Sequence, residues 1–308
     1  MAMTLAESAK LSNDVLLKGV IETIITESEV LKHLLFIDIV GNGLTYNQEN
    51  TLPTAQFYGP GDTWTESTPT FTQKTATLKI LGGDADVDEF LRQTRSNVQN
   101  LKAIVTELKS KAVSRQFEDS FLYGDTAVDA KSFDGLHKLV PTDQKVHAGS
   151  GTTGAAGSIK KLKKLTRLVL PGGPNFLLMS RLTRDNLSSY AERNESPIQI
   201  TRGDFGKPVM HFNGVPILIS DYLLQTEAIS GDDYSAKTGG LTTTIFAFRF
   251  GEGELAGCQN GGITIKDLGD LEVKDATRTR IKWYVSMALF RTLALARYDG
   301  IADDVWAA

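Results

Sequence analysis

The residues of this chain that could carry out chemistry are few and far apart. Four histidines are present, and no two of them are three or four residues apart: His33, His137, His147 and His211. The sequence contains neither an H-E-x-x-H zinc motif nor a C-x-x-C pair. We therefore expect no metal site and no bound cofactor, and the sequence names no catalytic residue.

Glycine-rich segments are the second place where chemistry could occur. Gly251-Glu252-Gly253 begins like a dinucleotide-binding fingerprint, but the next glycine, Gly257, does not have the required spacing. We interpret this segment as a turn, because no phosphate-binding loop and no G-x-S-x-G motif occurs in the sequence. Cys258, the single cysteine, is typical of a small buried residue. These absences argue against an α/β enzyme.

One run of positive charge could bind an anion. Five cations lie within eight residues: Lys160, Lys161, Lys163, Lys164 and Arg167. One interpretation is contact with nucleic acid, and the other is the solvated face of a helix whose apolar side holds Ile159, Leu162 and Leu165. We favour the solvated face. The net charge of −4 also excludes a strongly basic nucleic-acid binder.

Length and composition set the scale of the fold. The 308 residues, 41% of them hydrophobic, suffice for one large domain or two modest ones. We expect no signal peptide, because no basic segment followed by an apolar one opens the chain, and no membrane helix, because no apolar run approaches about 18 residues. A single thiol fits assembly in a reducing cytoplasm.

Residues 1–81 divide into a helical segment and a ribbon. Apolar residues recur at helical spacing over 4–37, with a polar stretch to about Asn13 that fits an extended arm. Residues 44–81 are rich in threonine and poor in large apolar residues, and they predict two strands joined around Tyr58–Asp62. Such a ribbon is marginal alone in water. It needs a surface to lie against, and we expect part of that surface to come from outside its own chain.

The longest expected element is a helix. Gly82-Gly83 is expected to end the preceding strand, and Asp84 or Asp86 to cap a helix that reaches about Tyr123. About 36 residues would span roughly 54 Å. One apolar stripe runs along it and shifts after Ala112: Val87, Phe90, Leu91, Thr94, Val98, Leu101, Val105, Leu108 and Ala112, then Val113, Phe117 and Phe121. We expect this helix to be the spine of a domain.

The remaining chain mixes short helices and strands, so the fold class is α+β. Helices are expected from Ile159 and after Ser180, a buried strand over 175–179, and a polar surface loop over 225–240. Asn213-Gly214 predicts a tight hairpin turn. Strands are expected at 242–250 and, with one heavily charged face, at 271–285; residues 287–301 form an apolar end segment.

In their order, these parts resemble the Hong Kong 97-type capsid fold of tailed bacteriophages. The resemblance covers nearly the whole chain and rests on four stretches: Thr75–Ile80 leading into Val87–Leu91; Leu122–Asp125 with Phe133–Leu136; Phe212–Ile217 leading to Ser220-Asp221; and Arg278–Tyr284. It implies an N-terminal arm and helix (1–43), an E-loop hairpin (44–81), a P domain with the spine helix (82–135), an A domain (136–240) and a return to P-domain strands with a C-terminal segment (241–308).

The resemblance also implies a function and partners. The protein would be a major capsid protein without enzymatic activity, forming hexamers and pentamers of an icosahedral shell around double-stranded DNA. It would be assembled in the host cytoplasm and end in the virion. A separate scaffolding protein, a portal and cement proteins are the implied partners. The alternative is a bacterial encapsulin, a shell of the same fold that holds a cargo enzyme.

Charge on the ribbon suggests one contact between subunits. Between Tyr46 and Gln73 the charged side chains are all acidic: Glu49, Asp62 and Glu66. The expected spine helix carries Arg92, Arg95 and Lys102 along one polar side. We hypothesise that the ribbon of one subunit lies over this basic side of its neighbour. Because the ribbon tip has no lysine, the covalent lysine–asparagine cross-link of some relatives is not expected there.

Overall fold

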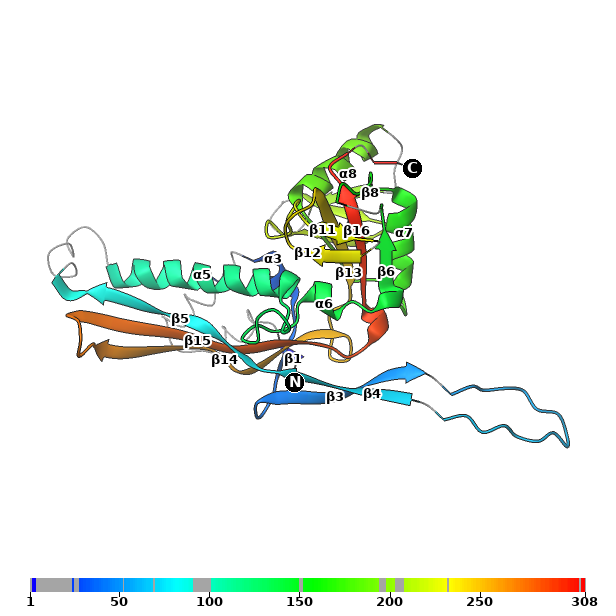
Figure 1. The fold of residues 1–308 in the computed structure, drawn as a ribbon, viewed down its shortest axis with the longest axis horizontal. Coiled ribbons are helices and arrows are strands. Elements are labelled where there is room, and N and C mark those ends of the chain that lie inside the picture. Colours follow the sequence, from blue (N-terminus) through cyan, green and yellow to red (C-terminus); the bar gives the residue numbers. More distant parts are fainter. Residues whose placement is uncertain are drawn as a thin grey trace.

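The computed structural model describes residues 2–3, 24, 28–51, 53–68, 70–90, 101–149, 152–193, 198–202, 208–231, 233–304 and 306–307. Figure 1 shows an elongated molecule. A long helix over a narrow sheet extends to one side, a ribbon extends to the other, and a compact domain stands above. Among the helices of these residues, none is long and apolar enough to cross a membrane.

The narrow sheet carries the spine helix α5 (Leu101–Tyr123). Its strand order is β1 (Ala2–Met3), β2 (Phe36–Asp38), β14 (Leu255–Asp270), β15 (Ala276–Leu289) and β5 (Lys79–Asp88). Phe117 of α5 stacks on Trp283 of β15 with ring centroids 5.0 Å apart. Both side chains are fully buried, so aromatic packing fixes the helix to the sheet.

Two expectations for the spine need correction. Strand β5 does not end at Gly82-Gly83 but pairs with β15 as far as Asp88, so no helix begins at Asp84 or Asp86. Glycine is needed here because a Cβ on Gly82 would lie 2.2 Å from the carbonyl oxygen of Ile281. The predicted apolar stripe is also wrong at Phe90, Leu108 and Ala112, which are exposed; the buried apolar side of α5 begins at Val113. Residues 91–100 lie outside the described residues.

The upper domain is built on a second sheet. Its strand order is β6 (Lys145–His147), β16 (Leu295–Ala302), β13 (Thr242–Phe248), β7 (Phe176–Met179), β10 (Val215–Ile219), β9 (Pro208–Phe212) and β8 (Ile198–Arg202). Alternate residues of β13 face two cores. Ile245 and Ala247 pack with helices α7 (Ile159–Leu168) and α8 (Arg181–Arg193), whereas Phe246 and Phe248 pack toward the spine helix.

Residues 241–308 are therefore shared between the two sheets. Of the strands in this segment, β13 and β16 belong to the upper sheet, and β14 and β15 belong to the narrow sheet. The expected return of 241–308 to the P domain is corrected in this respect. All seven residues of β13 are buried, as in a central strand covered on both faces.

Strand β14 was not predicted from the sequence because glycines interrupt its pattern. Gly257 lies against Phe36, whose ring would be 2.5 Å from an added Cβ. Gly261 and Gly262 both have φ of +68°, and the register with β15 shifts between Gln259 and Ile263. The strand thus bulges at positions whose left-handed backbone conformation favours glycine.

Shorter elements complete the fold: α3 (Glu29–His33), β3 (Gly43–Thr51), β4 (Thr70–Thr77), α6 (Leu136–Leu139), a 3-10 turn (Thr142–Gln144), β11 (Ala228–Ser230), β12 (Asp233–Ala236) and a second 3-10 turn (Thr292–Ala294). The Asn213-Gly214 hairpin is confirmed, with φ of 49° and 81°. The expected polar loop 225–240 contains the β11–β12 hairpin. Of the helix expected over 4–37, residues 4–23 and 25–27 lie outside the described residues, and 36–38 form a strand.

Candidate functional site

The base of the ribbon is anchored on its own chain. Strands β3 and β4 pair from Gly43 opposite Thr77 to Thr51 opposite Thr70. The side-chain amide of Gln48 donates to the carbonyl oxygen of Leu289 at 3.0 Å, and Tyr46 packs on Phe290 with ring centroids 4.8 Å apart. A small apolar cluster lies beneath: Ile39, Ala76, Cys258 and Ala288. Burial raises the pKa of the Cys258 thiol to about 12, so this thiol is not an activated nucleophile.

The distal part of the ribbon contacts only itself among the described residues. Tyr58 stacks on Trp64 at 4.2 Å, and the Thr65 amide donates to the Tyr58 hydroxyl at 3.1 Å. Phe57 and Trp64 are 107% and 77% exposed. Figure 1 shows this segment projecting beyond the body of the molecule. Large aromatic side chains held in solvent by a locally ordered turn are typical of a surface that becomes buried by a partner.

The six residues proposed for the inter-subunit contact are described only in part. The Asp62 carboxylate accepts from the Gly59 amide at 2.5 Å and closes the tip turn, and Glu66 is exposed nearby. Glu49 lies in β3 opposite Phe71. Lys102 at the start of α5 forms an ion pair with Asp267 of β14. Arg92 and Arg95 lie outside the described residues, so the pairing stays a prediction.

The charged face of β15 is partly neutralised within the chain. Arg278 and Arg280 lie opposite Asp86 and Asp84 of β5, and each forms two hydrogen bonds of 2.6 and 2.7 Å with its partner. These hydrogen bonds lower the pKa of both carboxyl groups. The heavily charged face expected from the sequence thus carries its own counter-charges at Arg278 and Arg280.

A polar buried site lies where α5 meets the upper sheet, around His137. The His137 ring stacks between Tyr123 at 5.1 Å and Tyr234 at 3.8 Å. Its Nε2 lies 3.3 Å from the Glu227 carboxylate, and its Nδ1 lies 3.4 Å from a guanidinium nitrogen of Arg297. This network fits a neutral ring that donates through Nε2 and accepts at Nδ1. Burial lowers the pKa of His137, and the Glu227 carboxylate offsets only part of this shift.

Glu227 connects the spine helix to the upper sheet. The hydroxyl of Tyr123, the last residue of α5, donates to its carboxylate at 2.6 Å, and the Thr244 hydroxyl of β13 donates to the other oxygen at 2.5 Å. Burial and the nearby Glu227 carboxylate raise the pKa of Tyr123. Each carboxylate oxygen therefore has a donor, as a buried charge requires.

Arg297 is the charged centre of the same site and is 1% exposed. It forms ion pairs with Asp233 of β12 and, at 2.9 Å, with Asp299. The His147 ring lies 2.5 Å from Asp299, and Lys145 pairs with Asp233. Burial raises the pKa of Asp299, while Arg297 opposes that shift. We call these residues the polar joint: Tyr123, His137, Lys145, His147, Glu227, Asp233, Tyr234, Arg297 and Asp299.

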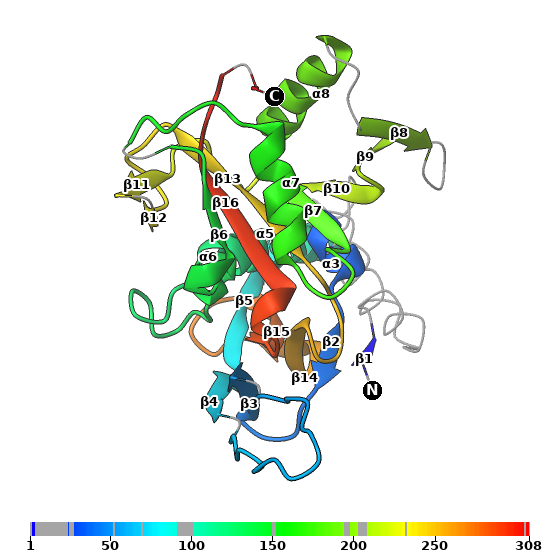
Figure 2. The same ribbon diagram turned by 90° about the vertical axis from the view of Figure 1, so that its right-hand side faces the viewer.

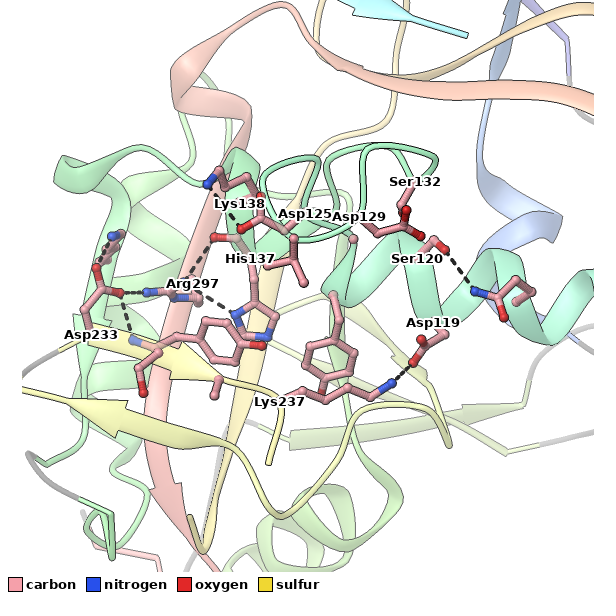
Figure 3. Close-up of a pocket in the computed structure, with 18 residues that line it drawn as sticks. Asp119, Ser120, Asp125, Asp129, Ser132, His137, Lys138, Asp233, Lys237 and Arg297 are labelled. Carbon is pink, nitrogen blue, oxygen red and sulfur yellow. Dashed lines mark hydrogen bonds and ion pairs between the residues drawn. The ribbon is translucent and has the colours of Figure 1, made fainter. Parts of the chain in front are cut away.

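A pocket of about 580 Å³ borders the polar joint. Figure 3 shows Lys237 reaching Asp119 of α5 on one side and Arg297 reaching Asp233 on the other. Both ring nitrogens of His137 are engaged, so the ring has no nitrogen left to activate Ser120 or Ser132 in the pocket wall. Within the described residues, no group of His, Cys, Asp or Glu could hold a metal ion. The arrangement can join two parts of the chain, and it lacks the geometry of nucleophilic catalysis.

Sequence reasoning missed the polar joint because its members are distant along the chain. His137 and Glu227 are 90 residues apart, and His137 and Arg297 are 160 apart. The only local signal was the presence of Asp233 and Tyr234 in a segment otherwise typical of a surface loop. Partners brought together by sheet topology leave no spacing pattern to detect.

Comparisons with known proteins agree with this architecture. The sequence pattern of the phage capsid family matches residues 13–296. The SrpI encapsulin complex of Synechococcus elongatus PCC 7942 superposes with a TM-score of 0.68 at 18% identity, covering 100% of this chain and 99% of that one. A structure from Microbacterium phage Oxtober96 superposes with a TM-score of 0.62 at 15% identity, covering 89% of this chain and 90% of that one. The capsid of a native GTA particle superposes with a TM-score of 0.62 at 12% identity, covering 87% of this chain and 88% of that one. None of the curated proteins matches the sequence.

Proposed function

This chain belongs to the phage capsid family, and we propose that it builds the icosahedral head of a tailed phage around double-stranded DNA. It is a structural shell protein with the Hong Kong 97-type fold and not an enzyme. The identities to the solved structures are low, so they carry the fold alone. The finer role therefore rests on the surfaces of this chain.

The observation that carries the proposal is the ribbon. Its tip exposes Phe57 and Trp64 at the far end of a hairpin whose base is fixed to its own subunit. A surface like this on one side of a molecule, complementary to a different surface elsewhere, makes a head-to-tail contact, and such contacts close into rings. Rings of five and six subunits are the units of an icosahedral shell. The proposal includes a separate scaffolding protein, a portal, cement proteins, assembly in the host cytoplasm and a place in the virion.

The experiment is assembly of the purified full-length chain. We expect light scattering over a wide concentration range, with scaffold supplied, to rise at a threshold concentration, and electron microscopy to show closed shells. A strictly monomeric protein with a compact radius under every condition would contradict the proposal. Because the ribbon tip has no partner within the described chain, assembly should bury Trp64, and its fluorescence should shift to shorter wavelength as shells form.

An encapsulin-type compartment is the second candidate. It is favoured by one observation, the superposition on an encapsulin over the full length of both chains. The two roles differ in what the shell contains. Particles purified from the native source should hold nucleic acid protected from nuclease if the chain forms a phage head, and a protein cargo without such nucleic acid if it forms an encapsulin.

A further inference from the structure

Helix α7 presents a cationic face to solvent, and its structure distinguishes that face from an ordinary solvated one. Ile159, Leu162 and Leu165 are buried against the upper sheet, as the sequence predicted. Four cations on the opposite side are exposed: Lys160, Lys163, Lys164 and Arg167. Lys161 is set apart, because its amine donates to the carbonyl oxygen of Ala148 at 2.8 Å. Figures 1 and 2 show α7 on the outside of the upper domain.

These four cations form no ion pair with any carboxylate of the described residues. The neighbouring helix α8 behaves differently, since Arg181 pairs with Asp221 and Arg184 with Asp185. On the narrow sheet, too, Arg278 and Arg280 have carboxylate partners. Single exposed lysines elsewhere in the described residues, such as Lys131 and Lys274, also form no ion pair, but α7 gathers four such cations on one helix of a chain whose net charge is −4.

The placement of these charges weakens the helix that carries them. The first turn of α7 has no acidic residue and two lysines, although the N-terminal end of a helix dipole favours negative charge. Lys160 and Lys164, and likewise Lys163 and Arg167, are four residues apart, where like charges repel. Arg167 donates a hydrogen bond to the carbonyl oxygen of Lys163 at 3.3 Å, but no carboxylate of the described residues offsets the repulsion, and this favours a role for the charges toward an external partner.

The chemistry of the face favours a phosphate backbone over an acidic protein. Three of the four cations are lysines, which bind phosphates as mobile point charges and are depleted at protein–protein interfaces. No exposed aromatic or large aliphatic side chain lies among them to anchor a protein partner; Leu170 is the nearest exposed large hydrophobic residue and follows the helix. We infer that the cationic face of α7 lies on the inside of the shell and holds the backbone of enclosed double-stranded DNA without reading its sequence. This inference rests on the proposed phage-head function.

The test measures DNA binding by the unassembled full-length chain. The variant K160Q/K163Q/K164Q/R167Q removes the four charges, and K111Q/R181Q/R184Q/R291Q removes four that are paired with carboxylates elsewhere. The probe is a short duplex of random sequence, followed by fluorescence anisotropy at several NaCl concentrations. If the four cations neutralise four phosphates, the DNA affinity of the parent should fall about 100-fold between 50 and 200 mM salt. The α7 variant should lose most of this dependence, and the control should keep it.

A second measurement locates the face in the shell. An amine-reactive polymer too large to pass through the shell should modify Lys160, Lys163 and Lys164 in dissociated subunits and spare them in intact shells, as read by mass spectrometry. Modification in intact shells would overturn the inference, and so would unchanged DNA binding by the α7 variant. Polyglutamate that binds more tightly than DNA of equal charge would assign the face to an acidic protein instead. If the parent forms no shells by electron microscopy, the proposed function itself fails, whereas the anisotropy result still decides whether α7 binds DNA.

Discussion

The ribbon tip and the polar joint differ in where their side chains find partners. At the tip, Phe57 and Trp64 project into solvent although water is a poor environment for them. In the joint, Glu227, Arg297 and Asp299 are each 1% exposed and are engaged by groups of the same chain. The joint therefore contributes to the folding of the subunit, and the tip has its use only after folding. The comparison predicts two separable classes of mutant.

The largest expected effect is the loss of Arg297. Arg297→Met leaves Asp299 buried without its counter-charge, and breaking a buried pair in this way costs about 3–5 kcal/mol of unfolding free energy. Urea unfolding of the subunit measures the change. Adding Asp299→Asn should recover part of the loss, because the uncompensated charge is then removed. The matched control, Arg181→Met, breaks an exposed and solvent-screened pair and should leave the unfolding free energy almost unchanged. Equal losses in the two single variants would erase the contrast.

The tip should show the opposite behaviour. The double variant Phe57→Ser, Trp64→Ser removes aromatic anchors that typically contribute at least about 2 kcal/mol each to an interface. We expect shell yield to collapse while the urea midpoint of the subunit stays unchanged. Gln56→Ser with Thr63→Ser alters neighbouring polar positions and should assemble like the parent. A lowered midpoint in the aromatic variant would place the tip in the folded core after all.

Acid should weaken the joint through His137. Burial holds the pKa of this ring below its ordinary value, so the folded state keeps the ring neutral while the unfolded chain takes up a proton. Stability is then full above pH about 6.5 and falls by about 1 kcal/mol per pH unit below it, until the lowered pKa is reached. Asp299, whose pKa is raised by burial, acts in the opposite direction, because the folded state then keeps a proton on this carboxyl group that the unfolded chain releases.

Substitution isolates this contribution of His137. Unfolding curves of the parent and of His137→Gln at pH 7.5 and 5.5 should show a smaller fall for the variant. His33→Gln is the comparison, because the pKa of His33 is also lowered by partial burial but His33 lies outside the joint. An identical pH dependence in parent and His137→Gln would show that the ring is not the titrating group.

A smaller effect is expected from the charges between ribbon and spine. Exposed pairs contribute only about 0.2–1 kcal/mol each, although a shell repeats them in every subunit. E49K/D62K/E66K and, separately, R92E/R95E/K102E should each lower shell yield at low salt, and the combined variant should recover part of it. Because Lys102 already pairs with Asp267 in its own subunit, it should contribute least to the contact with a neighbouring ribbon. Parental assembly by both sets would refute the pairing.

We expect no covalent cross-link between subunits at the ribbon tip during maturation. The segment from Tyr46 to Gln73 has no lysine, and Lys74 lies near the anchored base opposite Tyr46. Denaturing gels of mature particles should therefore show a single band near 33.6 kDa. A ladder that survives boiling and reductant would mean that an amine elsewhere forms a cross-link.

Local patterns in the sequence predicted the elements that local chemistry determines. The Asn213-Gly214 turn, the apolar face of α7 and the buried strand β7 follow from positive φ, from helical periodicity and from a short apolar run. The continuation of β5 through Gly82-Gly83 could not be predicted, because glycine is required there by the close approach of a carbonyl group nearly 200 residues away. The polar joint could not be predicted for the same reason, since its members are far apart in the sequence. The sequence predicted a ribbon that lacks a partner in its own chain, but it could not show that the base packs on the body and that the distal part alone remains in solvent.

The position of Cys258 turns the only thiol of the chain into a natural reporter. It lies fully buried in the cluster beneath the ribbon base, with Ala76 on the ribbon side. Lifting the base away from the narrow sheet would uncover this thiol to a reagent. The rate of labelling in subunits and in shells would therefore time that opening, without a foreign label and at a known place in the sequence.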